Sequence, residues 1–187
     1  LRTMLHDPAL GSPGRFWKGN IHTHSTLSDG MRSAEHVCAT ILGAELHAPA
    51  TALGEIWHIL AVGLPLDFAP NAPGETGPDL AARALAAGAF VAIPHPGWYA
   101  LTTEDANSIP GAHAVEVYNH TSQLRTERGD GVYLADQLLA QGRRLGLIAV
   151  DDAHFACGDA FGGWLMVRAE ADEPEPLLAA LKAGRRA

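Results

Sequence analysis

Short apolar runs with strand character recur along the chain and are separated by helical or polar segments. The predicted strands cover residues 20–24, 41–46, 55–64, 90–93, 112–118, 145–150 and 164–169. The predicted helices cover residues 33–40, 79–87, 131–141 and 176–183, and glycines 88, 142 and 184 end the last three. Strands that alternate with helices predict an α/β protein with a parallel sheet and helical crossovers.

Three segments are predicted to be loops. Residues 1–19 and 65–78 are rich in Pro and Gly, and residues 119–130 are polar. The first of these is an expected loop or edge segment, with Phe16 and Trp17 packing it against the body of the protein.

Ionisable side chains fall at the ends of several predicted strands. His22 and His24, then His95, then Asp152 and His154 each lie at or just after an apolar run. In an α/β barrel the carboxyl ends of the strands gather on one face, where active sites lie. The distribution therefore predicts a single site built from distant parts of the chain.

The strongest local signal is the stretch N-I-H-T-H-S-T-L-S-D-G at residues 20–30. Residues i and i+2 of a strand point to the same side, so His22 and His24 form a chelating pair for a transition metal. A tight turn can bring Asp29 to the same place. The alternative is a strand with two histidines facing solvent.

Asp152 and His154 repeat the i, i+2 spacing. Either Asp152 is the ligand, or Asp151 is the ligand and Asp152 caps a helix. Glu45 is a candidate bridging carboxylate, or else a surface group. His58 lies inside an apolar run, where a hydrogen-bonded core histidine is the alternative.

Together these residues form a donor set of imidazoles and carboxylates without thiolate, which suits Zn, Mn or Fe. The predicted ligands are His22, His24, Asp29, Glu45, His58, His95, Asp152 and His154. They exceed the needs of one ion, so we expect two or three divalent cations. His47 and His120 are candidates for contacting the ligands or the substrate, and His6, His36 and His113 for structural or surface positions.

Composition narrows the function. A chain of 187 residues favours one domain, and its formal net charge of −8 disfavours nucleic acid as a partner while permitting small anionic substrates. No apolar run reaches membrane-spanning length, and the first residues lack a signal-peptide core. Cys38 and Cys157 are expected to be reduced and buried, with a disulfide as the alternative, and the predicted location is cytoplasmic.

The sequence resembles the polymerase-and-histidinol-phosphatase (PHP) family of metal-dependent hydrolases. The resemblance rests on H-T-H-S-T-L-S-D-G at 22–30, G-A-E at 43–45, the strand around residue 58, P-H-P at 94–96, V-E-V-Y-N at 115–119 and D-D-A-H at 151–154. It implies a distorted seven-stranded (β/α)7 barrel in one domain, with up to three ions at the strand ends. E-L-H-A and V-E-V-Y-N also resemble the carbaryl-hydrolase-like subgroup.

The resemblance further implies how the ligands are shared. One ion would lie on His22, His24, Glu45 and Asp152, a second on Glu45, His58 and His95, and a third on Asp29 and His154.

The sequence departs from the family pattern in one place. The family's strand ending in Thr-Asp-His or Ser-Asp-His has no counterpart between the first helix and G-A-E. Either this strand is truly lacking, or a segment near residues 40–41 is missing and the numbering closes over it. We favour the second explanation, which a Cα–Cα spacing of about 3.8 Å throughout residues 37–43 would contradict.

The leading functional hypothesis is hydrolysis of a small phosphate ester by a metal-activated water. Asp152 or His154 would move protons. Arg125 and Arg128, with His120, are candidates for substrate binding, and solvated loop arginines are the alternative.

Two other functions remain open. One is hydrolysis of a carbamate, amide or non-phosphate ester, although neither Lys18 nor Lys182 ends a core strand, as a carboxylated bridging lysine would. The other is a non-catalytic metal-binding module.

Overall fold

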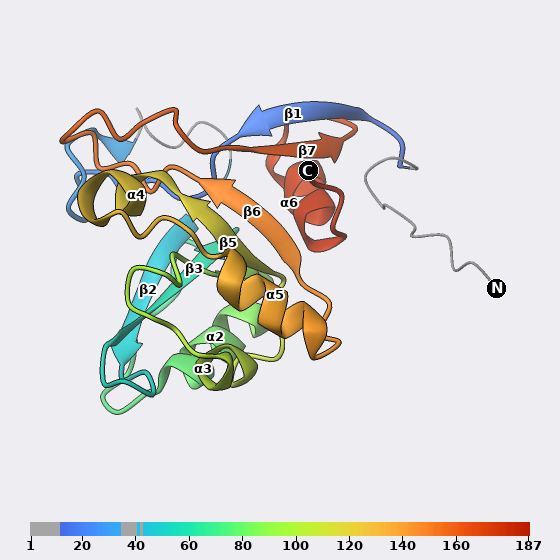
Figure 1. Ribbon diagram of the computed structural model, residues 1–187. Helices are drawn as coiled ribbons and strands as arrows, with labels where there is room; N and C mark the ends of the chain where they lie inside the picture. The colour runs from blue at the N-terminus through green and yellow to red at the C-terminus, as the bar shows by residue number, and fades with distance from the viewer. Residues whose placement is uncertain (1–11, 35–40, 42) are drawn as a thin grey trace.

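The computed structural model describes residues 12–34, 41 and 43–187 (Figure 1). The strands are β1 (Arg15–Gly19), β2 (Gly43–Pro49), β3 (Ile56–Val62), β4 (Phe90–Ile93), β5 (Ala114–Asn119), β6 (Gly146–Val150) and β7 (Leu165–Ala169). The helices are α2 (Gly77–Ala86), α3 (Thr103–Asn107), α4 (His120–Thr126), α5 (Val132–Ala140) and α6 (Pro174–Lys182). Among the described residues, no helix is long and apolar enough to cross a membrane.

The strands form two separate sheets. Five of them make a mixed sheet in the order β2-β3-β4-β5-β6, and β1 pairs with β7 in a two-stranded antiparallel sheet. Within the larger sheet β2, β3 and β4 are antiparallel, whereas β4, β5 and β6 are parallel. The described strands therefore form no closed barrel, and the prediction of a (β/α)7 barrel is wrong.

Connection length explains this error. Only residues 50–55 join β2 to β3, and a parallel crossover needs about a dozen residues or more. The two strands therefore pair as an antiparallel hairpin, which a strict alternation of strand and helix does not allow. Residues 35–40 and 42 lie outside the described part of the chain. The predictions of a helix at 33–40, of a buried Cys38 and of the Cα–Cα spacing at 37–43 all involve these residues.

The first strand also lies earlier than predicted. Residues 20–24 contain only an isolated bridge between Thr23 and Ala153, whereas β1 occupies part of the predicted loop 1–19. Gly14 permits this pairing because a Cβ there would lie 2.3 Å from the carbonyl oxygen of Ala169. Trp17 is partly buried and packs against the core that contains β7 residues, as predicted.

The predicted polar loop 119–130 contains α4. The side chain of Asn119 accepts a hydrogen bond from the backbone N–H of Ser122 at 2.8 Å and caps this helix, which ends at Glu127 in the left-handed region. The short helix α3 was also not predicted, although Thr102 and Asp105 form its capping box. Both helices were missed because they are short and their main sequence signals are the capping residues.

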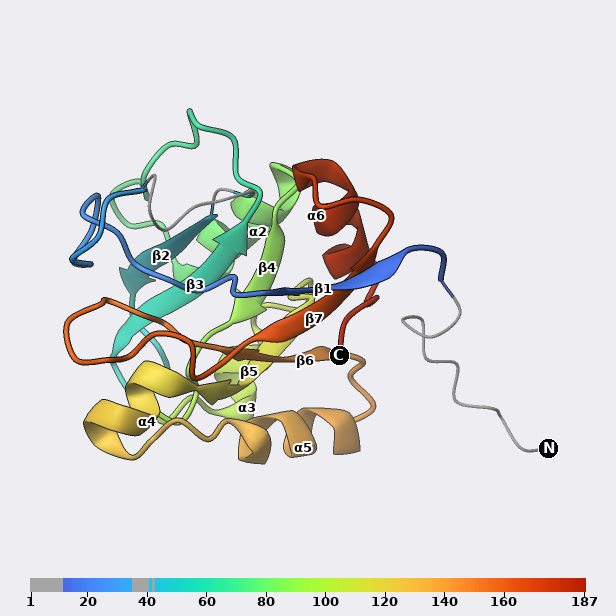
Figure 2. The same ribbon diagram turned by 90° about the horizontal axis from the view of Figure 1, so that it is seen from above.

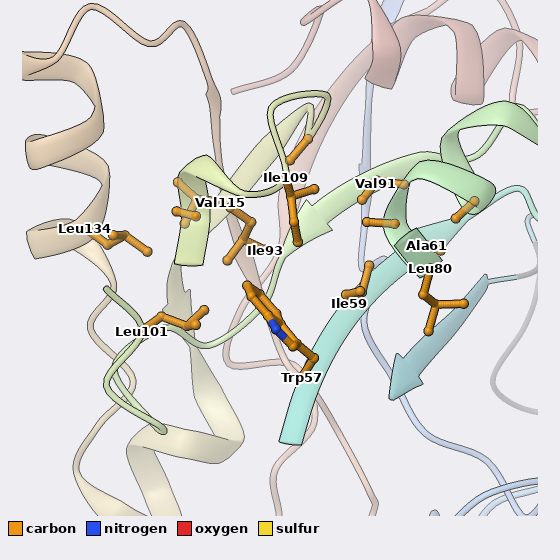
Figure 3. Packing of buried hydrophobic residues seen from close by; sticks show 14 of the residues in the cluster. Trp57, Ile59, Ala61, Leu80, Val91, Ile93, Leu101, Ile109, Val115 and Leu134 are labelled. Carbon is orange, nitrogen blue, oxygen red and sulfur yellow. The ribbon is translucent and has the colours of Figure 1, made fainter. Parts of the chain in front are cut away.

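The five-stranded sheet separates two cores. On one face α2, α3 and α5 cover Trp57, Ile59, Val91 and Val115 (Figure 3). On the other face, β1, β7 and α6 lie over the sheet (Figures 1 and 2). Because side chains alternate along a strand, the second face also carries the polar residues described next.

Candidate metal centre

Strand register brings the first candidate ligands together on the sheet face beneath β1 and β7. In the β2–β3 ladder Glu45 lies opposite Leu60, and His47 opposite His58, so all four share a face. Glu45 Oε1 lies 2.8 Å from His58 Nδ1, and the Glu45 side chain is only 7% exposed. His58 therefore makes its side-chain contact with the carboxylate of Glu45.

His95 joins Glu45 from the turn after β4. Its Nε2 lies 2.7 Å from Glu45 Oε1, and its side chain is buried. The backbone of His95 has a φ of 23°, an unfavourable value for a residue with a side chain. Strained conformations of this kind concentrate at functional sites, where the surrounding structure enforces them.

His22 and His24 reach the cluster through main-chain contacts with residues 152–153. The backbone N–H of His24 donates to the carbonyl of Ala153 at 2.8 Å, and that of Asp152 to the carbonyl of His22 at 2.9 Å. Asp152 Oδ1 then lies 3.3 Å from His22 Nε2 and 3.0 Å from His24 Nε2. Glu45 approaches each of these nitrogens to 3.5 Å.

Asp29 and His154 complete the outer end of the cluster. Asp29 Oδ1 lies 2.9 Å from His24 Nδ1, and its Oδ2 lies 3.4 Å from His154 Nε2. The rings of His24 and His154 stack with centroids 4.1 Å apart. The Asp29 side chain is 71% exposed, so this end of the site is open to solvent.

The structure separates the roles of the two adjacent aspartates. The carboxylate of Asp151 accepts backbone hydrogen bonds from Phe161, Gly162 and Gly163 at 2.6–2.8 Å, which fixes the loop after β6. The carboxylate of Asp152 lies among the histidines, and its φ of 56° is again unfavourable. Asp152 is therefore placed to bind a cation, whereas Asp151 holds the loop.

Glu116 is a central residue that sequence reasoning did not assign. Its side chain is fully buried and accepts hydrogen bonds from His22 Nδ1 at 2.6 Å, the His95 backbone N–H at 2.7 Å and Asn119 Nδ2 at 2.9 Å. A carboxylate within the apolar run of β5 was the available signal. Since Nδ1 of His22 donates to Glu116, its Nε2 lone pair points into the cluster.

The donor atoms fit a divalent cation. Within the described residues, His22 Nε2 and Asp152 Oδ1 are buried without a hydrogen-bond partner, a costly state that a bound cation would relieve. The donors form four groups of three, and within each group the donor atoms lie within 4.8 Å of one another. Glu45, Asp152 and three of the histidines each belong to two groups. The groups are His22–His24–Glu45, His22–His95–Asp152, His24–Asp152–His154 and Glu45–His58–His95.

The electrostatics of the cluster favour charged carboxylates. Burial alone would raise the pKa of Glu45, but hydrogen bonds from the surrounding histidines hold that pKa well below its usual value. The pKa of Asp152 falls to about 2, because His22 and His24 outweigh its burial. Burial would lower the pKa of His22, but Asp152 and Glu116 raise it well above its usual value.

The cluster lies in a cleft of about 1380 Å³. Arg125 lines this cleft, 3.8 Å from the buried carboxylate of Asp159. His120 is not among the lining residues of the cleft. Its Nδ1 lies 2.9 Å from the Tyr118 hydroxyl, and a Cβ at Gly162 would lie 2.1 Å from its ring, so it supports the loop after β6.

The remaining candidates lie around the cleft or away from it. His47 is exposed, with its Nε2 3.2 Å from Glu45 Oε2. His113 lies apart from the cluster, where its Nδ1 accepts a hydrogen bond from the backbone of Val91. Cys157 is a free thiol but is exposed, so the prediction of a buried cysteine there is wrong.

Comparison with known proteins gives one relevant match. No family model matches the sequence, and no curated protein is significantly similar to it. Among solved structures, the chain is similar to a two-domain protein from Bacteroides vulgatus ATCC 8482 that contains a predicted PHP-like metal-dependent phosphoesterase. The TM-score is 0.55 and the identity 21%, over 82% of this chain and 45% of that one. The likeness is one of fold. The chain spans less than half the length of that protein.

Proposed function

We propose that the chain is a metal-dependent hydrolase that cleaves a small phosphate ester. The observation that carries this proposal is one cluster of histidines and carboxylates in which two buried donor atoms, His22 Nε2 and Asp152 Oδ1, have no hydrogen-bond partner. The shared fold with a protein that contains a predicted PHP-like phosphoesterase supports the same reaction class.

Two or three cations of Zn, Mn or Fe would be held by overlapping ligand sets. His22, His24, Glu45 and Asp152 would hold one. Glu45, His58 and His95 would hold a second, since Glu45 Oε1 lies within 2.8 Å of a nitrogen of each histidine. Asp29 and His154 would hold a third at the exposed end.

Divalent cations at such a site lower the pKa of water toward neutrality and offset the charge of a phosphoryl group. The protein supplies positioning. Nδ1 of His154 donates to the carbonyl of Asp152 at 2.8 Å, so its Nε2 is the atom free to accept a cation or a proton. Arg125, on the cleft wall, would hold a phosphoryl oxygen.

The net charge of −8 disfavours a nucleic-acid backbone, so we propose a small-molecule substrate. The cytoplasmic location and the carbaryl-hydrolase-like subgroup remain predictions.

The test is turnover of an aryl phosphate by the metal-loaded protein, with metal content measured in parallel. His22→Ala and His95→Ala should each abolish turnover and lower bound metal while the protein stays folded. His113→Ala removes a histidine outside the cluster and should retain both activity and metal.

Other outcomes would replace this proposal. Hydrolysis of an aryl carbamate or acetate in place of phosphomonoesters would indicate the alternative hydrolase. Bound metal with no hydrolysis of any ester would indicate a non-catalytic module.

A further inference from the structure

We infer that Phe161 and Trp98 bind the organic part of the substrate, and that this part carries an apolar ring. The inference rests on the proposed function, since it treats the phosphate as bound at the metal centre. Phe161 and Trp98 both line the cleft that contains the cluster.

Trp98 places an indole directly beside the candidate ligands. Its ring centroid lies 5.3 Å from that of His58 and 5.4 Å from that of His95, with edge-to-face geometry at both. Its backbone N–H donates to the carbonyl of His95 at 2.9 Å, which ties the two residues into one turn. The residue is 41% exposed, so part of the indole remains available to a molecule in the cleft.

Phe161 is an exposed phenyl group on a fixed backbone. It is 87% exposed, and its backbone N–H donates to the buried carboxylate of Asp151 at 2.8 Å. Asp159, also fully buried, accepts the backbone N–H groups of His154 and Phe155 at 3.0 and 2.9 Å. Two buried carboxylates therefore hold the loop that presents this ring.

The conformation of Phe161 adds to this argument. Its φ of 68° lies in the left-handed region, which bulky side chains rarely adopt. A strained backbone and an exposed aromatic ring at the same position, on the wall of a cleft, indicate a residue retained for contact with a ligand.

The other apolar groups on the cleft wall help to define the surface. Leu27 lines the cleft and is 85% exposed. Trp164 also lines it, but the ammonium group of Lys18 lies 3.7 Å from its ring centroid and occupies that face. Trp98, Phe161 and Leu27 are therefore exposed apolar side chains that the cleft wall offers to a ligand.

The size of the cleft and the charge of the protein indicate what this apolar surface binds. It forms part of the wall of a cleft of about 1380 Å³, which is larger than the roughly 300–1,000 Å³ typical of pockets for small ligands. A phosphate at the metal centre would fill only a small part of that space. The net charge of −8 disfavours an anionic lipid surface as the occupant. A phosphomonoester with a ring-bearing alcohol or phenol would place its phosphate at the metal centre and its ring against these apolar side chains.

The test compares two phosphomonoesters with similar leaving groups, 2-phenylethyl phosphate and ethyl phosphate. We expect kcat/KM of the metal-loaded protein to be at least about tenfold higher for the phenylethyl ester, mainly through a lower KM. Phe161→Ala and Trp98→Ala should each reduce this ratio roughly 3- to 10-fold, the range expected for loss of one aromatic contact.

Control variants distinguish the loss of an aromatic contact in the cleft from the effect of removing any exposed apolar side chain. Leu66→Ala removes an apolar side chain that is 90% exposed and is not among the cleft-lining residues, so it should leave the ratio unchanged. Phe161→Tyr keeps the ring and should also retain the ratio. Metal content and melting temperature are measured for each variant, because Trp98 touches two candidate ligands.

Binding of the corresponding phosphonates, 3-phenylpropylphosphonate and propylphosphonate, gives a readout without turnover. Equal kcat/KM for the two esters, or a ratio that Phe161→Ala leaves unchanged, would overturn this inference while the proposed function stood. Preferential binding of the phenyl phosphonate without hydrolysis would support the inference and overturn the proposed function. Failure to hydrolyse either ester and to bind either phosphonate would overturn both.

Discussion

Replacing Glu116 with glutamine changes one buried atom at the base of the cluster and tests how the candidate ligands are held in place. The carboxylate accepts hydrogen bonds from His22, the His95 backbone and Asn119. A glutamine side chain offers one oxygen acceptor, and its NH₂ group can only donate. At least one of the three donors would therefore lose its partner.

Either orientation of the amide has a predictable consequence. If the NH₂ group faces His22, Nδ1 must become an acceptor and the proton moves to Nε2, the atom that should bind a cation. If it faces the other side, the N–H groups of His95 and Asn119 lose an acceptor. A partner that orients a ligating histidine typically contributes 10- to 100-fold in metal affinity.

We therefore expect Glu116→Gln to weaken Mn or Zn binding by about 10- to 100-fold, or roughly 1.4–2.8 kcal/mol. The metal-free protein should also lose about 1–3 kcal/mol of stability, the usual cost of an unsatisfied buried polar group. Calorimetric titration and chemical denaturation measure the two effects. Glu170→Gln, at an exposed position, is the matched control. Wild-type affinity in Glu116→Gln would refute the reasoning.

Three further predictions concern protons and the loop after β6. Burial would lower the pKa of His22, but the nearby carboxylates of Asp152 and Glu116 raise it well above its usual value of 6.5. Protons therefore compete with cations, and metal affinity should rise as the pH increases above 6.5. Calorimetry in buffers of different ionisation enthalpy should detect proton release, and a pH-independent affinity would contradict this. Asp151→Asn removes an acceptor from the loop amides and should lower the free energy of unfolding by about 1–3 kcal/mol; unchanged urea denaturation would contradict it. Gly162→Ala should destabilise by about 1–3 kcal/mol, since its Cβ would overlap the His120 ring, whereas Gly19→Ala has open space; equal melting temperatures would contradict this.

The sequence predicted the composition of the cluster better than the fold. Side-chain alternation in β2 and β3 places Glu45 and His58 on one face whether the sheet is open or closed. The i, i+2 spacing of His22 and His24 likewise requires no complete strand, since one bridge beside Ala153 holds the pair. Local geometry therefore brought the candidate ligands together although the barrel prediction failed.

The features that could not be predicted from the sequence depend on pairing between residues far apart in the chain. The short connection at 50–55 could have indicated an antiparallel hairpin, but nothing local shows that β1 pairs with β7. The role of Glu116 emerges only when β5 lies beside residues 22 and 95. Phe161 was not singled out from the sequence, because its exposed position depends on hydrogen bonds from the loop backbone to buried carboxylates such as that of Asp151.

Anomalous scattering from crystals grown with Mn or Zn tests the central claim most directly, because it locates the cations. We predict peaks within the cluster, with the first about 2.0–2.2 Å from Nε2 of His22 and from oxygens of Glu45 and Asp152. Crystals that contain the metal but show no peak among these side chains would contradict the account.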